Sequence, residues 1–359
     1  MVADLRRAED IDPEWLTAVL HGSGDLPTGR VVDFEATAVG NGLVADCYCF
    51  ALTYADAPPG APATLVGKFP SHDPVSRKSG TDHQLYAREI AFYREMAATV
   101  AIRTPRPYAA IIDPCTDDFV LMLGDLAPAR QGDQLAGCSI ADAALAMREA
   151  AALHAPRWGE AALERIDWLA ARPAALGAMV DAMLPTIIAL FRERFAGVLV
   201  PEHLAMVDRL PAALAAMRGN RSAPVTVIHA DFRLDNMMFD VNGGAASMAT
   251  LDWQTVTAGP GLTDVAYFLS AGIAPSERRS HEVELVRLYH GELLRRGVGD
   301  YGWDQCWHDY RRFTIHGIVM GVFSALSVER TDRADALFAA MTEGACEQAA
   351  DHGSFDFWT

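Results

Sequence analysis

Residues 227–239 read VIHADFRLDNMMF, and this stretch decides the fold. The apolar, β-branched run Val225–Ile228 predicts a strand, so Asp231 falls just beyond its end, where loops present functional side chains. Asn236 follows five residues later and is expected to begin the next strand. Asp and Asn often only cap turns. A histidine, two acids and an asparagine within eight residues nevertheless favour a functional loop.

The residues after this motif predict a β-hairpin. Val241–Gly244, with the sequence VNGG, is typical of a hairpin turn, and the strand Met248–Leu251 leads directly into Asp252. A tight hairpin brings Asn236 close to Asp252. These two side chains offer the hard oxygen ligands that Mg²⁺ prefers in combination with substrate phosphates. Asp231 is then a separate carboxylate that can orient or deprotonate an attacking hydroxyl.

A lysine lies inside a short apolar strand in the first third of the chain. In Leu65–Phe69 (LVGKF), strand alternation places Lys68 on the same face as Val66, while the two terminal residues face the other way. One interpretation is an edge-strand lysine that deters aggregation. The other is a functional ammonium group that requires a buried partner.

The segment Thr81–Val100 supplies that partner. Its length and periodicity predict a helix, and Glu89 lies within the apolar stripe of that helix. A carboxylate on a packing face needs a cation, because an unpaired buried charge is costly. Lys68 is the candidate. Two other acids, Glu95 and Asp235, fall out of register with their functional neighbours and are expected to be solvated.

The remaining patterns predict a small β-rich lobe and a larger helical lobe. Strands are expected at Val31–Val39, Ala45–Tyr54, Thr64–Phe69 and Phe119–Leu123. Helices are expected at Ser139–His154, Ala174–Phe195, Pro201–Arg218, Ser280–Arg296, Trp303–Val328 and Arg333–Asp351. We therefore divide the chain into residues 1–123, a nucleotide-binding lobe, and residues 124–359, a helical lobe with an inserted hairpin, joined near Leu123–Ala127.

Composition narrows the possible partners. The 359 residues are 51% hydrophobic and carry a formal charge of −17, which disfavours nucleic acid as a partner. We see no secretory signal and no membrane span, and the scattered cysteines suit free thiols in a reducing cytoplasm. Cys47 and Cys49 form a close pair, but no further ligands complete a zinc set. A cytoplasmic location is therefore expected, and the oligomeric state stays open.

Taken in order, these residues carry a resemblance to a known family. The hairpin motif, the LDWQ at residues 251–254 and the GPGLTDVAYFL at residues 259–269 resemble the aminoglycoside phosphotransferase and choline kinase group of the protein-kinase-like fold. The stretch LGDLAPARQGDQLAGCS and the LHAPRW after it are similar to bacterial members of its ecdysteroid-kinase-like branch. The resemblance spans about Val31 to Leu269. It implies an α+β, two-lobed kinase-like fold, with a small β-rich N-lobe and a larger helical C-lobe.

The resemblance also implies a function: ATP- and Mg²⁺-dependent transfer of a γ-phosphate to a hydroxyl of a small molecule. Asp231 is then the catalytic base or hydroxyl-orienting residue, and Asn236 and Asp252 hold Mg²⁺. Lys68, paired with Glu89, contacts the α- and β-phosphates of ATP.

Four further implied roles concern the surroundings of the nucleotide and the motif. Met122, Leu123 and Asp125 would line the adenine slot through connector backbone groups. The turn with Gly40 and Gly42 would approach the phosphates, although a Gly-x-Gly here also suits a plain hairpin turn. His229 is expected to be structural, and Asp264 is expected to brace the catalytic loop, with a plain helix cap as its alternative.

Departures from the protein kinases bear on the choice of substrate. Ala230 stands where protein kinases have arginine, and Trp253-Gln254 follows Asp252 in place of Phe-Gly. Asp264 comes so soon afterwards that no room is left for an activation loop. The rival of a small-molecule kinase is therefore a catalytically silent nucleotide-binding scaffold of the same fold, which the complete set of motif residues disfavours.

The identity of the acceptor stays open at the level of sequence. Cationic aminoglycosides suit the acidic charge, whereas lipid-like or steroid-like alcohols suit the apolar late helices. The sequence also leaves open the choice between ATP and GTP. Candidate pocket-lining residues, each more often a packing residue, are Trp158, Trp168, Trp253, Tyr267, His308, Tyr310 and His316.

Overall fold

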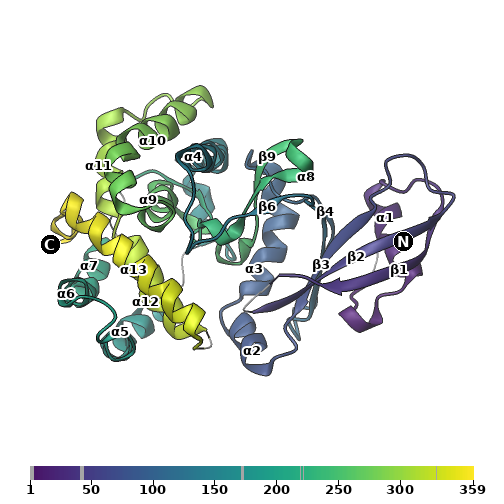
Figure 1. The fold of residues 1–359 in the computed structure, drawn as a ribbon, viewed down its shortest axis with the longest axis horizontal. Helices are drawn as coiled ribbons and strands as arrows, with labels where there is room; N and C mark the ends of the chain where they lie inside the picture. Colours follow the sequence, from purple (N-terminus) through teal and green to yellow (C-terminus); the bar gives the residue numbers. More distant parts are fainter. Residues whose placement is uncertain (1–3, 41–43, 171–173, 219, 221, 329) are drawn as a thin grey trace.

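The computed structural model describes residues 4–40, 44–170, 174–218, 220, 222–328 and 330–359, with the backbone alone for residues 174–181. A sheet-containing lobe and a helical lobe lie side by side along the long axis (Figure 1). The predicted α+β, two-lobed architecture is therefore confirmed. None of the helices in the described part of the chain combines the length and apolar character that a bilayer span requires.

The N-terminal lobe is built on a five-stranded antiparallel sheet in the order β1-β2-β3-β5-β4. Its strands are β1 (Arg30–Ala38), β2 (Ala45–Ala55), β3 (Thr64–Pro70), β4 (Pro107–Ile112) and β5 (Phe119–Gly124). β3 and β5 therefore lie inside the sheet, where they pair on both sides. Lys68 is thus on an inner strand, and the interpretation as an edge-strand lysine is wrong.

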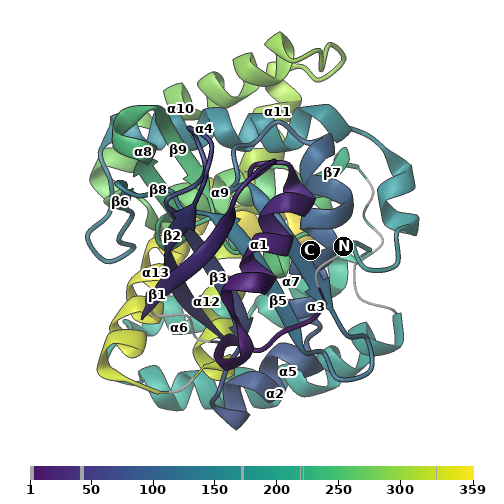
Figure 2. The same cartoon turned by 90° about the vertical axis from the view of Figure 1, so that its right-hand side faces the viewer.

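The two faces of this sheet are covered by different helices. α1 (Pro13–Ser23) lies in front of the sheet in Figure 2, and its apolar residues share a core with Val120 and Met122 of β5. α2 (Pro74–Asp82) and α3 (Leu85–Ala91) follow β3, and α3 packs on the opposite face with Phe119, Leu121 and Leu123. The alternation of a strand therefore divides β5 between two cores.

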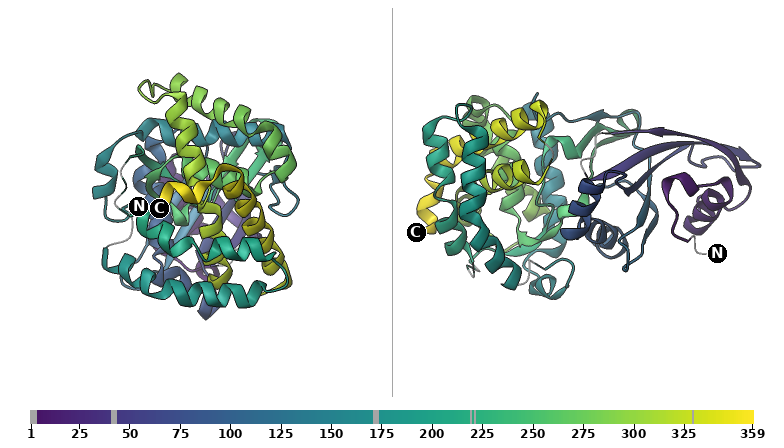
Figure 3. Two further views of the ribbon diagram at one scale, coloured as in Figure 1. Left: turned by 90° about the vertical axis from the view of Figure 1, so that its left-hand side faces the viewer. Right: turned by 90° about the horizontal axis from the view of Figure 1, so that it is seen from below.

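The C-terminal lobe consists mainly of helices, which gather at the end of the molecule opposite α1 (Figure 3). They are α4 (Ile140–His154), α5 (Ala174–Phe195), α6 (Pro201–Val207), α7 (Leu210–Met217), α9 (Leu262–Ala271), α10 (Pro275–Arg295), α11 (Trp303–Phe313), α12 (His316–Ser327) and α13 (Asp332–His352). α9 is buried along its length. It packs against α4 and α10 through α13, and therefore forms the centre of the lobe.

Two small sheets sit where the lobes meet. β6 (Arg130–Gln131), β8 (Met237–Asp240) and β9 (Ala246–Thr250) form one, and β7 (Val225–Ile228) pairs with β10 (Thr257–Pro260) in the other. The segment α8 (Val241–Gly244) is a tight turn, because Asn242 and Gly243 have positive φ of 52° and 68°. The predicted β8–β9 hairpin is therefore confirmed.

Several predicted boundaries were wrong. The single helix expected over Thr81–Val100 is a set of shorter segments: α3, a π-helical turn at Phe92–Met96 and a 3-10 turn at Ala97–Thr99. The segments expected as one helix at Pro201–Arg218 and at Trp303–Val328 are each two helices. α1, β4 and β10 were not predicted.

Candidate active site

Lys68 connects the two lobes through ion pairs. Its Nζ lies 2.7 Å from Glu89 Oε2 on α3 and 2.9 Å from Asp252 Oδ1, which follows β9. The predicted Lys68–Glu89 pair therefore forms. Burial acts to lower the pKa of Lys68, but the two carboxylates outweigh it and hold this pKa well above its usual range. Lys68 is a permanent cation between the lobes.

Glu89 is fixed from both lobes. Its side chain is buried, and Oε1 accepts a hydrogen bond from the backbone N–H of Trp253 at 3.3 Å. Burial raises the pKa of Glu89, while the charge of Lys68 opposes that rise. Next to it, the Trp253 ring stacks on Phe92 with centroids 3.9 Å apart. Trp253 is therefore a packing residue at the lobe interface.

The motif loop is tied down by Asp264, in the first turn of α9. Asp264 Oδ2 accepts the backbone N–H of His229 at 2.7 Å, and Oδ1 accepts that of Ala230 at 2.9 Å. His154 adds a contact at 3.2 Å. Burial acts to raise the pKa of Asp264, but His154 and His229 outweigh it, so this pKa is lowered. The prediction that Asp264 braces this loop is confirmed in its geometry.

The loop itself has an unusual backbone. Ala230 has φ of 64°, a left-handed conformation that costs an L-residue about 1–2 kcal/mol, and Asp252 has φ of 61°. Such values persist only where the surroundings fix them, and they cluster at functional sites. His229 is fully buried and its Nε2 lies 2.8 Å from the Leu251 carbonyl oxygen, which joins the loop to the end of β9. His229 therefore has the structural position expected of it.

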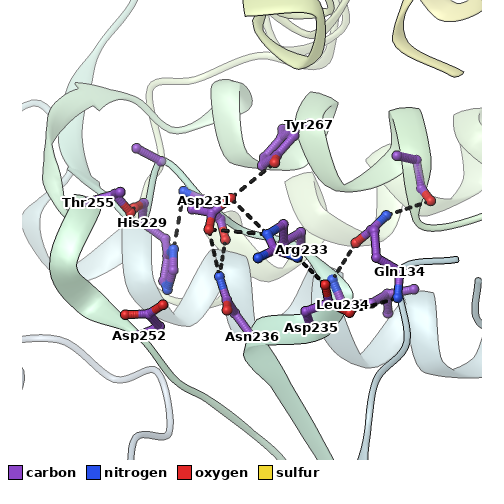
Figure 4. A network of polar contacts seen from close by, with 12 residues as sticks. Gln134, His229, Asp231, Arg233, Leu234, Asp235, Asn236, Asp252, Thr255 and Tyr267 are labelled. Atoms are coloured by element: carbon purple, nitrogen blue, oxygen red, sulfur yellow. Dashed lines mark hydrogen bonds and ion pairs between the residues drawn. The ribbon is translucent and has the colours of Figure 1, made fainter. Parts of the chain in front are cut away.

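Asp231 lies at the centre of a hydrogen-bond network (Figure 4). Its Oδ1 accepts from the Tyr267 hydroxyl at 3.0 Å and from Arg233 Nε at 3.1 Å, and its Oδ2 accepts from Asn236 Nδ2 at 2.9 Å. Burial acts to raise the pKa of Asp231, but Arg233, His229 and these hydrogen bonds outweigh it, so the pKa is lowered. Asp231 is therefore an ionised carboxylate, able to align a hydroxyl group and accept its proton.

The neighbouring acid, Asp235, was expected to be solvated, and this was wrong. It is only partly exposed, forms an ion pair with Arg233, and accepts the backbone N–H of Gln134 at 2.9 Å. Because Arg233 also contacts Asp231, this arginine lies between two carboxylates. The ion pair with Arg233 therefore holds the Asp235 side chain against the motif loop.

Asn236 and Asp252 lie at the open end of the hairpin, Asn236 just before β8 and Asp252 two residues after β9. Met237 pairs with Thr250, and the backbone N–H of Leu251 donates to the Asn236 carbonyl oxygen at 2.8 Å. Asn236 Nδ2 donates to both the backbone oxygen and Oδ2 of Asp231, each at 2.9 Å. Its Oδ1 is therefore the atom left to act as a ligand.

This donor set fits a hard divalent cation in part. Amide and carboxylate oxygens are suitable ligands for Mg²⁺, which usually binds one or two protein carboxylates and completes its shell with water and phosphate oxygens. In the part of the chain that the structure describes, no group of three His, Cys, Asp or Glu side chains is arranged to hold a metal alone. Asn236 and Asp252 would therefore supply only part of the ligand shell of such an ion.

The predicted nucleotide-lining residues fall on different faces of the sheet. Leu123 lies opposite Val66 on the face that carries Lys68. Met122, in contrast, is fully buried in the core beneath α1, so its side chain lies on the other face from Lys68. The carboxylate of Asp125, in the connector, is 4.0 Å from Cys49 Sγ.

The end of β1 lies at the same end of the sheet as Lys68. The backbone N–H of Val39 donates to the Cys47 carbonyl oxygen at 2.9 Å, and Cys47 is the partner of Lys68 in the β2–β3 register. Gly40 is exposed, with φ of 75°, a conformation that favours glycine. Gly42 lies outside the described residues.

Two residues of this network were not predicted from the sequence. Arg233 stands within the motif at residues 227–239, and its charge beside two acids was an available signal. Gln134 Oε1 accepts the backbone N–H of Leu234 at 2.9 Å and so supports the loop. The residues next to Gln134 in the sequence do not indicate this role, because its partner, Leu234, lies far along the chain.

Of the proposed pocket aromatics, Tyr267 and His316 contact the motif loop, the latter through Nε2, which lies 3.3 Å from the Ala230 carbonyl oxygen. The others have different surroundings. Tyr310 is fully buried among α10 and α13, and His308 packs on Phe357 near the C-terminus.

Trp168 is partly buried and packs against the main hydrophobic core. Its indole N–H donates to Glu95 at 2.8 Å. Glu95 is exposed, as predicted.

Comparison with known proteins identifies the family. The model of the phosphotransferase enzyme family matches residues 64–304, about two thirds of the chain, including Lys68, the motif loop and Asp252. The chain belongs to the phosphotransferase enzyme family. A search of curated protein sequences gave no match.

Solved structures confirm the kinase-like fold of this phosphotransferase. Choline kinase from Cryptosporidium parvum is similar, at 11% identity and a TM-score of 0.52, with 90% of this chain and 89% of that chain covered. Ethanolamine kinase from Plasmodium vivax is similar at 12% identity and a TM-score of 0.52, with 92% of this chain and 86% of that chain covered. A gentamicin complex of APH(2″)-IIa is similar at 16% identity and a TM-score of 0.53, with 94% of this chain and 98% of that chain covered. At these identities the similarity establishes the fold.

The Lys68 ion pairs predict an order of stabilities. Lys68→Met leaves Glu89 and Asp252 without their cation, and we expect it to lower the free energy of unfolding by about 3 kcal/mol. Glu89→Gln leaves Lys68 paired with Asp252, so its cost is smaller, about 1–2 kcal/mol. Urea denaturation followed by circular dichroism measures both free energies.

The control Lys78→Met removes an exposed ion pair with Asp82 and should lower the free energy of unfolding by less than about 0.5 kcal/mol. Equal costs for Lys68→Met and Lys78→Met would contradict the role of Lys68 as a buried cation between the lobes.

The anchoring of the loop predicts a second effect on stability. Asp264→Ala leaves two backbone N–H groups, those of His229 and Ala230, buried without their acceptor, and should cost about 2 kcal/mol or more. The control Asp356→Ala removes a carboxylate whose side chain is 81% exposed and should change the unfolding midpoint little. A loss for Asp264→Ala no larger than for the control would show that Asp264 is a plain helix cap.

Proposed function

We propose that this phosphotransferase moves the γ-phosphate of ATP, in the presence of Mg²⁺, to a hydroxyl group of a small organic molecule. The observation that carries the proposal is the position of Lys68, a cation whose side chain is only 13% exposed and which carboxylates from α3 and from the end of β9 hold at the lobe interface. Phosphoryl transfer requires positioning and charge stabilisation more than covalent chemistry, and an immobile ammonium group supplies both.

The nucleotide is proposed to bind beneath the β2–β3 face that carries Lys68. The ammonium group would contact the α- and β-phosphates, with Glu89 holding it in place. Backbone groups of Met122, Leu123 and Asp125 would line the adenine slot, and the turn containing Gly40 and Gly42 would lie near the phosphates. The register supports this arrangement, because Lys68 and the end of β1 lie at one end of the sheet and the connector lies at the other.

Asn236 and Asp252 are the proposed ligands of Mg²⁺. When bound, this ion would neutralise charge on the phosphate oxygens. The residues of the chain prepare the site without it: Asp231 orients the Asn236 amide, and the β8–β9 pairing fixes the distance between the two ligands. Gln254 Nε2, 3.0 Å from Asp252 Oδ2, orients that carboxylate.

Asp231 is the proposed catalytic residue. An ionised carboxylate with a lowered pKa is a weak base, so its main contribution would be to align the acceptor hydroxyl with the γ-phosphorus. The proton of that hydroxyl would pass to Asp231 as the new oxygen–phosphorus bond forms and the bond to the departing nucleotide breaks. This contribution to catalysis depends on the orientation of the Asp231 carboxylate, which its hydrogen bonds fix.

The acceptor is proposed to be a small hydroxylated molecule. Proteins of similar fold include a choline kinase, an ethanolamine kinase and a phosphotransferase in complex with gentamicin. Amino alcohols and aminoglycosides therefore belong in a first screen. Sugars and sterols extend it to uncharged acceptors. The charge of −17 supports an acceptor other than a nucleic acid.

Asp231→Asn tests the catalytic assignment. The change keeps the shape but removes the negative charge, so we expect γ-phosphate transfer to fall by about 10²–10⁴-fold. The thermal shift caused by Mg-ATP should persist, because the proposed phosphate and metal contacts remain. Transfer of labelled γ-phosphate from ATP or GTP to the acceptor panel is the measurement, with the exposed Asp240→Asn as control.

Two outcomes would change the interpretation of that experiment. Loss of both transfer and nucleotide binding in Asp231→Asn would indicate a folding role for this residue. A Mg-ATP thermal shift of the wild-type protein without transfer to any acceptor would favour the silent nucleotide-binding scaffold.

The thiols of β2 test the location of the nucleotide. Cys49 lies on the Lys68 face near Asp125, whereas Cys115 is exposed on a distant turn. Burial, with a contribution from Asp125, raises the pKa of the Cys49 thiol, so its alkylation should be slow. Mg-ATP at ten times its Kd should slow that alkylation about tenfold and leave Cys115 unchanged, as measured by mass spectrometry. Equal rates at Cys49 with and without nucleotide would contradict the proposed site.

A further inference from the structure

A buried tyrosine contacts the proposed catalytic carboxylate from outside the motif loop. The hydroxyl of Tyr267, on α9, donates to Asp231 Oδ1 at 3.0 Å (Figure 4). Tyr267 is 2% exposed, so this hydroxyl has little access to water. A buried hydroxyl that donates to an ionised oxygen forms a short-range, directional contact, which restricts the rotation of the carboxylate.

The other side-chain contacts of Asp231 come from its own loop. Arg233 and Asn236 lie two and five residues further along the chain, and Arg233 is shared with Asp235. These contacts shape the loop but move with it. Among the described residues, Tyr267 is the hydrogen-bonding side chain that ties Asp231 to a different element.

α9 therefore holds the loop at two points. Asp264 fixes its main chain through the N–H groups of His229 and Ala230, and Tyr267, three residues later, fixes the side chain of Asp231. Residues three apart share one face of a helix. The position of the carboxylate relative to the helical lobe is thus set by one face of its central helix.

The ring of Tyr267 is itself held by His316, at the start of α12. The two rings meet edge-on, with centroids 5.5 Å apart and an angle of 89°, and His316 Nε2 contacts the Ala230 carbonyl oxygen. A ring packed in this way cannot swing aside without disturbing the loop. The tyrosine is therefore a rigid support.

We propose that Tyr267 is a positioning residue for the reaction, which it serves by fixing the orientation of the Asp231 carboxylate. This inference rests on the proposed function of Asp231. Its physical basis is that small misplacements of an aligning group are costly, about 10²-fold for 1 Å. Removing the hydroxyl while keeping the ring isolates this effect from packing.

The test compares Tyr267→Phe with a matched control. Tyr301 is also buried in the helical lobe, and its hydroxyl donates to the buried carboxylate of Asp309 at 2.7 Å. Tyr301→Phe therefore removes the same kind of hydrogen bond elsewhere. Both variants, Asp231→Asn and the double variant Asp231→Asn/Tyr267→Phe are assayed with Mg-ATP.

The assay measures transfer to an acceptor found in the screen, and hydrolysis of ATP without an acceptor. In hydrolysis, the oxygen of water bonds to the γ-phosphorus as the bond to the β-phosphate oxygen breaks, which yields ADP and phosphate. We expect Tyr267→Phe to lower kcat by about 10- to 100-fold, with the KM for ATP unchanged. Tyr301→Phe should match the wild type. In the Asp231→Asn background, Tyr267→Phe should cause no further loss.

Three kinetic results would overturn the proposal: a kcat of Tyr267→Phe within twofold of wild type, an equal loss in Tyr301→Phe, or a change confined to the KM for ATP. A crystal structure of Tyr267→Phe tests it without turnover. The Asp231 carboxylate should move by more than about 0.5 Å, and an unmoved carboxylate would contradict the proposal. If the wild-type protein neither binds nor turns over Mg-ATP, the proposed function fails, while the crystal structure still decides whether Tyr267 positions Asp231.

Discussion

The ion pairs of Lys68 are the interaction on which the arrangement of the site depends. The ammonium group of Lys68 lies between two carboxylates, Glu89 from its own lobe and Asp252 from the end of the hairpin, so one positive charge bridges the two lobes. Glu89 also receives the Trp253 N–H, and Trp253 stacks on Phe92. Charge and packing thus fix α3 against the end of β9, and with it the distance between the sheet and the motif loop.

Two sets of elements position the other residues of the site around the Lys68 ion pairs. β7 and β9 deliver the motif loop and Asp252 to the lobe interface, and the β8–β9 register brings Asn236 beside Asp252. Behind them, α9 anchors the loop through Asp264 and contacts Asp231 through Tyr267. The strained conformations of Ala230 and Asp252 are maintained by these contacts. Backbone strain and buried charge therefore occur together at this site, a combination that is common at active sites.

The sequence predicted the parts of this arrangement that depend on short-range periodicity. Strand alternation placed Lys68 opposite Leu65 and Phe69, and the helical stripe placed Glu89 inside, so their pairing followed from the cost of burying a lone charge. The hairpin turn at residues 241–244 fixed the proximity of Asn236 and Asp252. α1 was not predicted, although Asp12 caps this helix and Gly24 ends it in a left-handed conformation, and both residues are helix signals that a sequence carries.

What could not be predicted depends on contacts between distant segments. α1 was not predicted, so the sequence did not show which segment covers the face of β5 that carries Met122. Asp235 also accepts the backbone N–H of Gln134, which lies in a distant segment, so the sequence did not show that Asp235 faces inward.

The most direct test of the proposed site is a crystal structure with Mg²⁺ and a non-hydrolysable ATP analogue. We expect Mg²⁺ on Asn236 Oδ1 and the Asp252 carboxylate, with Lys68 Nζ on the phosphates; a nucleotide bound away from Lys68, or a metal held by other residues, would contradict the proposal.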